Sequence, residues 1–93
     1  MQYEIVRTKR FKTAFIRIKR LPGFKEKIFT EIVHTIASGN KLSVEHRDHQ
    51  LTGNLKKFRE CHVSPNILLI YQIDSGILIL TLVNIGNHAQ LFK

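Results

Sequence analysis

The chain has 93 residues, enough for one domain near the lower size limit for folding without disulfides or metals. It is 43% hydrophobic, too apolar for a disordered chain, and its single cysteine excludes an internal disulfide framework. Fifteen Lys and Arg residues against seven Asp and Glu residues give a net charge of +8, which predicts a polyanionic partner: a nucleic acid, an anionic membrane surface or an acidic protein.

The positive charge is concentrated at the start of the chain. Residues 1–27 hold nine basic side chains and two acidic ones, a density that favours a working polyanion site over a merely solvated helix face. No apolar stretch approaches the roughly eighteen residues that a membrane span needs, and residues 1–12 lack the apolar segment of a signal peptide. We therefore expect one soluble domain over residues 1–93, located in the cytoplasm and without a membrane partner.

The first half of the chain predicts one strand and two helices. Residues 3–8 alternate between polar and apolar side chains and indicate a short strand. Thr8 is a suitable N-cap for a helix that runs to about Arg20, after which Leu-Pro-Gly at 21–23 breaks the chain. A second helix over 24–37 has a broad apolar face, and the Ser-Gly-Asn that follows closes it.

The second half predicts an antiparallel meander. Residues 42–54 are polar and irregular, the Asp-Ser-Gly at 74–76 reads as a short hairpin turn, and 86–93 reads as a loop or short tail. Three strand candidates lie between these segments, at 57–63, 67–73 and 77–85. A strand, two helices and then a meander predict an α+β domain with both helices packed on one face of the sheet.

Histidines are the candidate chemical groups. Four of the five lie in the second half, whereas His34 falls in the second predicted helix and is expected to be structural or exposed. RNA carries its own nucleophile, the 2′-hydroxyl, so a protein can cleave it with a base, an acid and cations for the phosphate. Strand alternation places Glu60 and His62 on one face, and His49 and His88 can reach them from the flanking segments. Histidines and a basic chain therefore allow acid–base cleavage of RNA.

Two other chemistries are weaker on the same residues. His46-x-x-His49 and Cys61-His62 supply zinc ligand types, but Cys61 and His62 point to opposite faces of a strand and cannot share one ion. Nothing in the sequence places a base beside the sulfur of Cys61, which is better interpreted as a small buried residue. We expect no metal and no cofactor.

Two segments carry a family resemblance. Residues 47–71, RDHQLTGNLKKFRECHVSPNILLIY, resemble the signature of YafQ-type toxins within the RelE/ParE superfamily. Residues 86–92, GNHAQLF, resemble the end of the same family, and the helix that opens TKRFK is similar to the way these toxins begin. The resemblance covers nearly the whole chain. It implies a RelE-like α+β fold, with an N-terminal strand and two helices packed on one face of a mainly antiparallel sheet.

The resemblance also implies a function and its partners. These toxins are metal-independent endoribonucleases that cut mRNA, typically in the ribosomal A site, and an antitoxin silences them. We therefore expect mRNA, the ribosome and a cognate antitoxin as partners, with a monomeric toxin inside a toxin–antitoxin hetero-oligomer.

Carried over residue by residue, the family's catalytic groups fall on four positions here: His49, His62, His88 and Phe92. For Phe92 the alternative is a hydrophobic plug that holds the C-terminus down. The RNA contacts are expected at Arg59, Lys56, Lys57, Glu60 and Asn66.

Arg59, Asn66 and Tyr71 each have a specific expectation. Arg59 is expected to clamp a phosphate, because a guanidinium matches it bidentately, or else to be a surface strand residue. Asn66 stands where the family has an acidic residue and cannot exchange a proton, while Leu55 and Lys57 replace the common Trp and Gly. Tyr71 is expected in the core.

Two rival functions remain at this point. One is a basic RNA- or DNA-binding module without catalysis, and the other is a ParE-like inhibitor of a topoisomerase, which shares the superfamily fold. The three histidines in motif context favour the ribonuclease, because ParE-like proteins do not need them.

Overall fold

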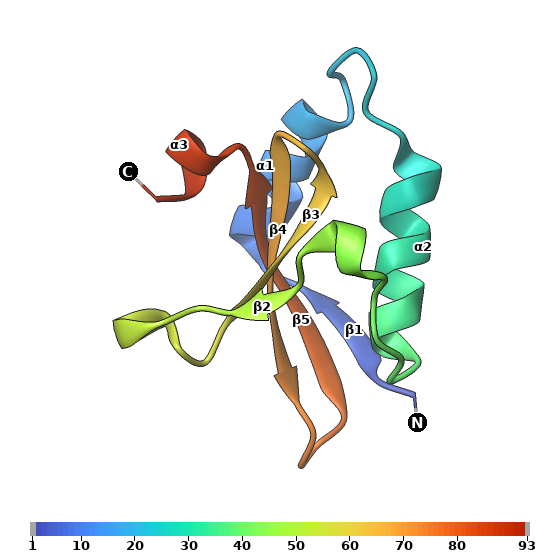
Figure 1. The fold of residues 1–93 in the computed structure, drawn as a ribbon, viewed down its shortest axis with the longest axis vertical. Helices are drawn as coiled ribbons and strands as arrows, with labels where there is room; N and C mark the ends of the chain where they lie inside the picture. Colours follow the sequence, from blue (N-terminus) through green and yellow to red (C-terminus); the bar gives the residue numbers. More distant parts are fainter. Residues whose placement is uncertain (1, 93) are drawn as a thin grey trace.

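The computed structural model describes residues 2–92, and in this part of the chain three helices accompany one five-stranded sheet (Figure 1). The strands are β1 (Glu4–Arg7), β2 (His49–Gln50), β3 (Arg59–Ser64), β4 (Ile67–Asp74) and β5 (Ile79–Gly86). The helices are α1 (Lys9–Ile18), α2 (Glu26–Ala37) and α3 (His88–Leu91), and there are short 3₁₀ turns at η1 (Val44–His46) and η2 (Gly53–Leu55).

The sheet has the order β1-β5-β4-β3-β2. Strand β1 pairs in parallel with β5, and the other three pairs are antiparallel. The predicted α+β class, with an N-terminal strand and a mainly antiparallel sheet, is therefore confirmed.

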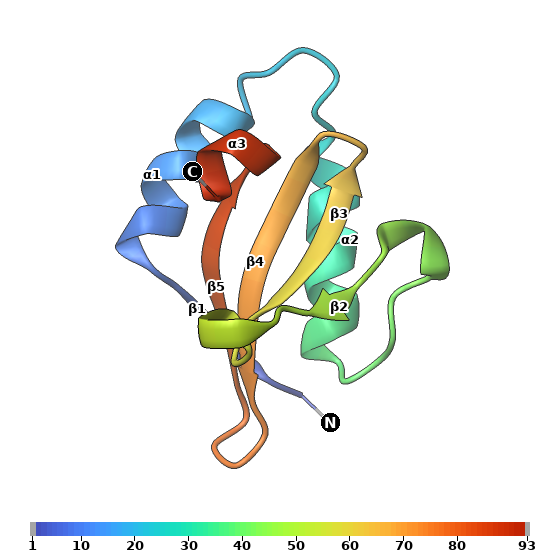
Figure 2. The same ribbon diagram turned by 60° about the vertical axis from the view of Figure 1, so that its left-hand side comes forward.

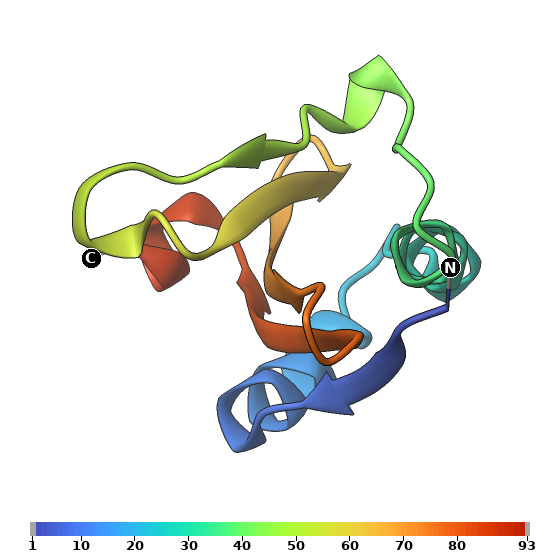
Figure 3. The same cartoon turned by 90° about the horizontal axis from the view of Figure 1, so that it is seen from below.

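A single core joins both long helices to the sheet. Helix α1 lies against β5 and α2 lies near β3, and their buried side chains form one cluster with side chains of β3, β4 and β5. Helix α3 lies on the opposite side of the sheet from α2 (Figure 3). The larger fully buried members of the core are Phe11, Ile18, Leu69, Tyr71, Leu80, Leu82 and Ile85. Because the helices cover one face, the other face of β3 and β4 is left for a site.

Thr8 begins α1, as predicted. Its hydroxyl oxygen accepts a hydrogen bond from the backbone N–H of Phe11 at 3.0 Å and donates one to the carbonyl oxygen of Val83 at 2.7 Å. The first bond satisfies a free donor of the first helical turn. The second ties the start of the helix to β5.

Helix α2 begins later than predicted, at Glu26. Phe24 packs its ring against Phe15 and Phe29, with centroids 6.0 and 6.5 Å apart, so it belongs to the aromatic cluster before the helix starts. Gly23 has a φ of +84°, which suits glycine, and turns the chain there.

The meander also departs from prediction at its turns. Strand β5 begins at Ile79 because residues 75–78 form the turn, where Asp74 accepts hydrogen bonds from the backbone N–H groups of Gly76 and Ile77 at 3.0 and 3.3 Å. Strand β3 begins at Arg59, since η2 and a turn precede it. The segment expected as a loop or tail contains helix α3.

Candidate active site

Strand β3 separates two sets of side chains, as its alternation predicts. Cys61 is fully buried in the core beneath the helices. Glu60 and His62 point to the other face, where they line an open pocket with Asn66 and His88. Glu60 is almost fully buried, whereas His62 is partly exposed. One carboxylate and two imidazoles therefore meet on the face that the helices leave open.

His49 joins this group through β2. It lies directly opposite Glu60 in the β2–β3 pair, and its Nε2 is 3.5 Å from Oε1 of Glu60. The Nδ1 of His49 is 2.7 Å from the carbonyl oxygen of Arg47. A carbonyl only accepts, so this bond places a proton on Nδ1 and leaves Nε2 facing the carboxylate.

Helix α3 carries His88 to the same pocket. Asn87 forms a reciprocal cap with Gln90: its side chain accepts from the Gln90 backbone N–H at 2.9 Å, and its own N–H donates to the Gln90 side chain at 2.8 Å. A Cβ at Gly86 would lie 2.6 Å from Oε1 of Gln90, so a larger residue there would disturb this cap. The ring of Phe92 lies 5.0 Å from that of His88.

The lysines predicted to contact RNA lie on the turn that precedes β3. Lys56 and Lys57 are both exposed, and the ammonium of Lys57 lies 5.3 Å from the ring centre of Phe58. Asn66 is exposed in the β3–β4 turn and lines the histidine pocket.

One protein family matches nearly the whole chain. Its sequence profile, described as the bacterial toxin of type II toxin–antitoxin systems, YafQ, matches residues 3–93. The chain belongs to the YafQ toxin family.

Individual relatives agree with this placement. The chain is 37% identical over 51 residues to the mRNA interferase toxin YafQ of Escherichia coli (strain K12), a match that covers 55% of the chain and 53% of the relative, about half its length. A metal-bound toxin of Helicobacter pylori is 38% identical, with a TM-score of 0.87 over 98% of this chain and all of that chain. The toxin–antitoxin complex DinJ–YafQ of E. coli has a TM-score of 0.87 at 22% identity over the full length of both chains, and so shares the fold.

Arg59 lies away from this YafQ-family histidine pocket. It is directly opposite Tyr71, a core residue, and so points to the helix side of the sheet. Its guanidinium contacts the Asp48 carboxylate through Nη2 at 3.1 Å and Nε at 3.4 Å. Alternation along β3 separates it from Glu60 and His62, which argues against the predicted phosphate clamp.

Cysteine and zinc chemistry also lack support. Burial, together with the nearby carboxylates of Asp48 and Glu60, raises the pKa of the Cys61 thiol to about 12, so the sulfur is protonated and not nucleophilic at neutral pH. His46 is turned toward β3, where its Nδ1 lies 2.8 Å from the carbonyl oxygen of His62. Within residues 2–92, no three His, Cys, Asp or Glu side chains lie close enough to hold one metal ion.

Part of the basic N-terminal segment lies beside helix α3, which carries His88. All nine of its Lys and Arg side chains are exposed: Arg7, Lys9, Arg10, Lys12, Arg17, Lys19, Arg20, Lys25 and Lys27. Lys9, Arg10 and Arg17 of α1 line a groove with Asn84 and Gln90, beside helix α3 (Figure 2). No helix within residues 2–92 has the length and apolar character to span a bilayer.

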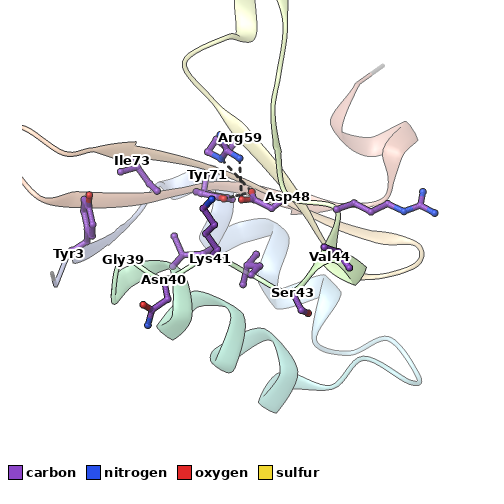
Figure 4. A pocket seen from close by; sticks show the side chains of 13 residues that line it. Tyr3, Gly39, Asn40, Lys41, Ser43, Val44, Asp48, Arg59, Tyr71 and Ile73 are labelled. Atoms are coloured by element: carbon purple, nitrogen blue, oxygen red, sulfur yellow. Dashed lines mark hydrogen bonds and ion pairs between the residues drawn. The ribbon is translucent and has the colours of Figure 1, made fainter.

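The sequence analysis did not single out the side chain of Asp48. This carboxylate accepts hydrogen bonds from Arg59 and from the hydroxyl of Tyr71 (Figure 4). It lies on the face of the sheet opposite the histidine pocket. The available signal was its place next to His49 in the resembling segment.

Proposed function

We propose that this YafQ-family chain is the toxin of a toxin–antitoxin pair and cleaves mRNA without a metal, using the RNA 2′-hydroxyl as the nucleophile. The observation that carries the proposal is the grouping of Glu60, His62 and His88 around one open pocket, with His49 paired to Glu60. The E. coli relative is named an mRNA interferase, which supports the choice of substrate.

The histidines have separate roles in the proposed reaction. His62 and His88 supply the base that takes the 2′-hydroxyl proton and the acid that protonates the leaving 5′-oxygen. His49, bonded at Nδ1 and facing Glu60 at Nε2, completes the proton-transfer group. Asn66 supplies hydrogen bonds to the RNA but no proton.

The remaining contacts hold the RNA. The exposed ammonium groups of Lys56 and Lys57 contact phosphates, and Glu60 orients the bound RNA while it holds His49. Phe92, packed on His88, offers an aromatic face to a base. The groove beside α3 is lined by Lys9, Arg10 and Arg17, and in this proposal the RNA strand follows it away from the site.

The same basic surface gives the toxin its protein partner. We propose that an antitoxin with acidic segments covers the face formed by residues 7–27, since complementary charge speeds association. The related E. coli YafQ was solved with the antitoxin DinJ. In this proposal the toxin is a monomer within the hetero-oligomer, acts in the cytoplasm and cuts mRNA on the ribosome. A purely binding module or a ParE-like inhibitor would not need the grouped histidines.

Removal of metal tests the chemistry. Cleavage of free RNA should continue in excess EDTA and leave a 2′,3′-cyclic phosphate and a 5′-hydroxyl, because the nucleophile belongs to the substrate. Ribosomes require Mg²⁺, so a second arm uses mRNA on ribosomes with a chelator selective for transition metals. A His62→Ala preparation controls for contaminating ribonuclease. Activity abolished by chelation and restored by a divalent ion, or 5′-phosphate products, would mean that the mechanism is different.

A further inference from the structure

Three side chains, those of Asp48, Arg59 and Tyr71, form a hydrogen-bonded group on the helix side of the sheet (Figure 4). The carboxylate of Asp48 accepts two hydrogen bonds from the guanidinium of Arg59, at 3.1 and 3.4 Å, and a third from the hydroxyl of Tyr71. Tyr71 is 1% exposed, and Arg59 lies directly opposite it on the neighbouring strand. The core therefore holds the Tyr71 donor in place, whereas the Arg59 side chain is 36% exposed and is held by its bonds to Asp48.

Asp48 connects this network to the proposed active site, because it immediately precedes His49. Arg47 has a left-handed backbone with a φ of 49°, and the chain then enters β2. Successive residues of an extended chain point to opposite faces. The side chain of Asp48 therefore points to the helix side, where it is bonded, and His49 points to the pocket side, where it meets Glu60.

His49 has few other restraints. Its side chain is 51% exposed and has two polar neighbours, the Glu60 carboxylate and the Arg47 carbonyl oxygen. Strand β2 contains only His49 and Gln50, so its pairing with β3 is short. The orientation of the Arg47 carbonyl, and with it the Nδ1 bond of His49, depends on where the backbone at Asp48 is held.

The hydrogen bonds that Asp48 accepts from Tyr71 and Arg59 persist near neutral pH, because both donors keep their protons. Burial raises the pKa of the Tyr71 hydroxyl, and its bond to Asp48 raises that pKa further, so the hydroxyl stays protonated and donates. The guanidinium of Arg59 is always charged. Each donor is thus available throughout the pH range in which histidines exchange protons.

We propose that Asp48, held by Arg59 and Tyr71, is a positioning residue that fixes His49 against Glu60 for RNA cleavage. This inference rests on the proposed function. All three residues lie on the opposite side of the sheet from the bound RNA, so they act through His49. This assigns Arg59 and Tyr71 a role although neither contacts the substrate.

The test is a double-mutant cycle on single-turnover cleavage of mRNA. Asp48→Asn should lower the cleavage rate by about tenfold to a hundredfold, the scale of a small displacement of a reacting group, while RNA affinity changes by less than about threefold. Tyr71→Phe keeps the ring and removes only the hydroxyl, and should lower the rate by about threefold to tenfold. In a His49→Ala background neither substitution should lower the rate further. Asp74→Asn, which changes an exposed carboxylate at the end of β4, is the matched control and should have no effect on the cleavage rate.

A spectroscopic readout accompanies the cycle. The ring ¹⁵N shifts of His49 should show the Nδ1–H form in the wild-type chain and an averaged pair of tautomers in Asp48→Asn and Tyr71→Phe. If Asp48→Asn fails to fold, the same double-mutant cycle is measured with Tyr71→Phe and His49→Ala. Equal losses in the presence and absence of His49, or wild-type rates in both variants, would overturn the positioning role while cleavage by the wild-type chain stands. Absence of cleavage by the wild-type chain would instead overturn the proposed function.

Discussion

His62→Ala and His88→Ala should each lower the rate of mRNA cleavage by about two orders of magnitude or more, the usual scale for acid–base groups. Both imidazoles line the pocket that Glu60 also lines, and in the proposed reaction one is the base and the other is the acid. Removal of one should leave the other unable to complete proton transfer. The measurement is the single-turnover cleavage rate, with circular dichroism and thermal unfolding as checks of the fold.

His34→Ala is the matched control for these variants. His34 is exposed on α2, the helix that covers the other face of the sheet, and its loss should change the rate hardly at all. Equal losses at His34, His62 and His88 would point to misfolding and contradict the assigned roles.

Phe11→Ala should lower the free energy of unfolding by about 3–5 kcal/mol, the usual cost of removing a buried aromatic ring. The Phe11 ring is 1% exposed and packs on both Phe15 and Phe29, with centroid separations of 5.4 and 6.0 Å. Together with Phe15, whose ring centroid lies 4.8 Å from that of Phe29, it joins α1 to α2 in the core. Because a small domain has a total stability of only about 5–15 kcal/mol, the change is a large fraction of it.

Urea unfolding measures this change, and Ile16→Ala provides its control. Ile16 lies on the same helix and is half exposed, so its truncation should cost much less than that of Phe11. A loss below about 1 kcal/mol for Phe11→Ala would mean that the aromatic cluster does not carry the packing of α1.

Residue patterns in the sequence were sufficient to predict β1, α1, α2 and the three longer strands of this fold, but not β2 or α3. The Thr8 cap and the apolar faces of the two helices follow from local periodicity, which does not depend on the rest of the chain. The start of α2 could not be predicted in the same way, because Phe24 fits the apolar pattern of the helix but packs on the rings of Phe15 and Phe29 before the helix begins. Helix α3 is too short to show periodicity, although the Asn87-x-x-Gln90 cap is a readable signal.

The candidate site also has a part that the sequence predicts and a part that it does not. Alternation along β3 was enough to place Glu60 and His62 together and Cys61 in the core. The partner of Arg59 could not be foreseen, because Asp48 reaches it from an irregular loop whose path no periodicity describes. The register of His49 on Glu60 depends on a two-residue strand that gives no pattern. Composition and alternation therefore predict which side chains of a strand share a face. The positions of the side chains on loops depend on tertiary contacts.

In the proposed reaction the RNA 2′-hydroxyl is the nucleophile, and an RNA that lacks this group at one position shows whether it is. An mRNA with a single 2′-deoxy nucleotide on the 5′ side of the cleaved bond differs from the natural substrate by one oxygen atom. Cleavage at that bond should fall by at least about a hundredfold, because the RNA has lost the group that the histidines activate, while neighbouring sites are still cut. Cleavage of the deoxy bond at an unchanged rate, with a 5′-phosphate on the product, would show that water is the nucleophile and would contradict acid–base transfer to the RNA's own hydroxyl.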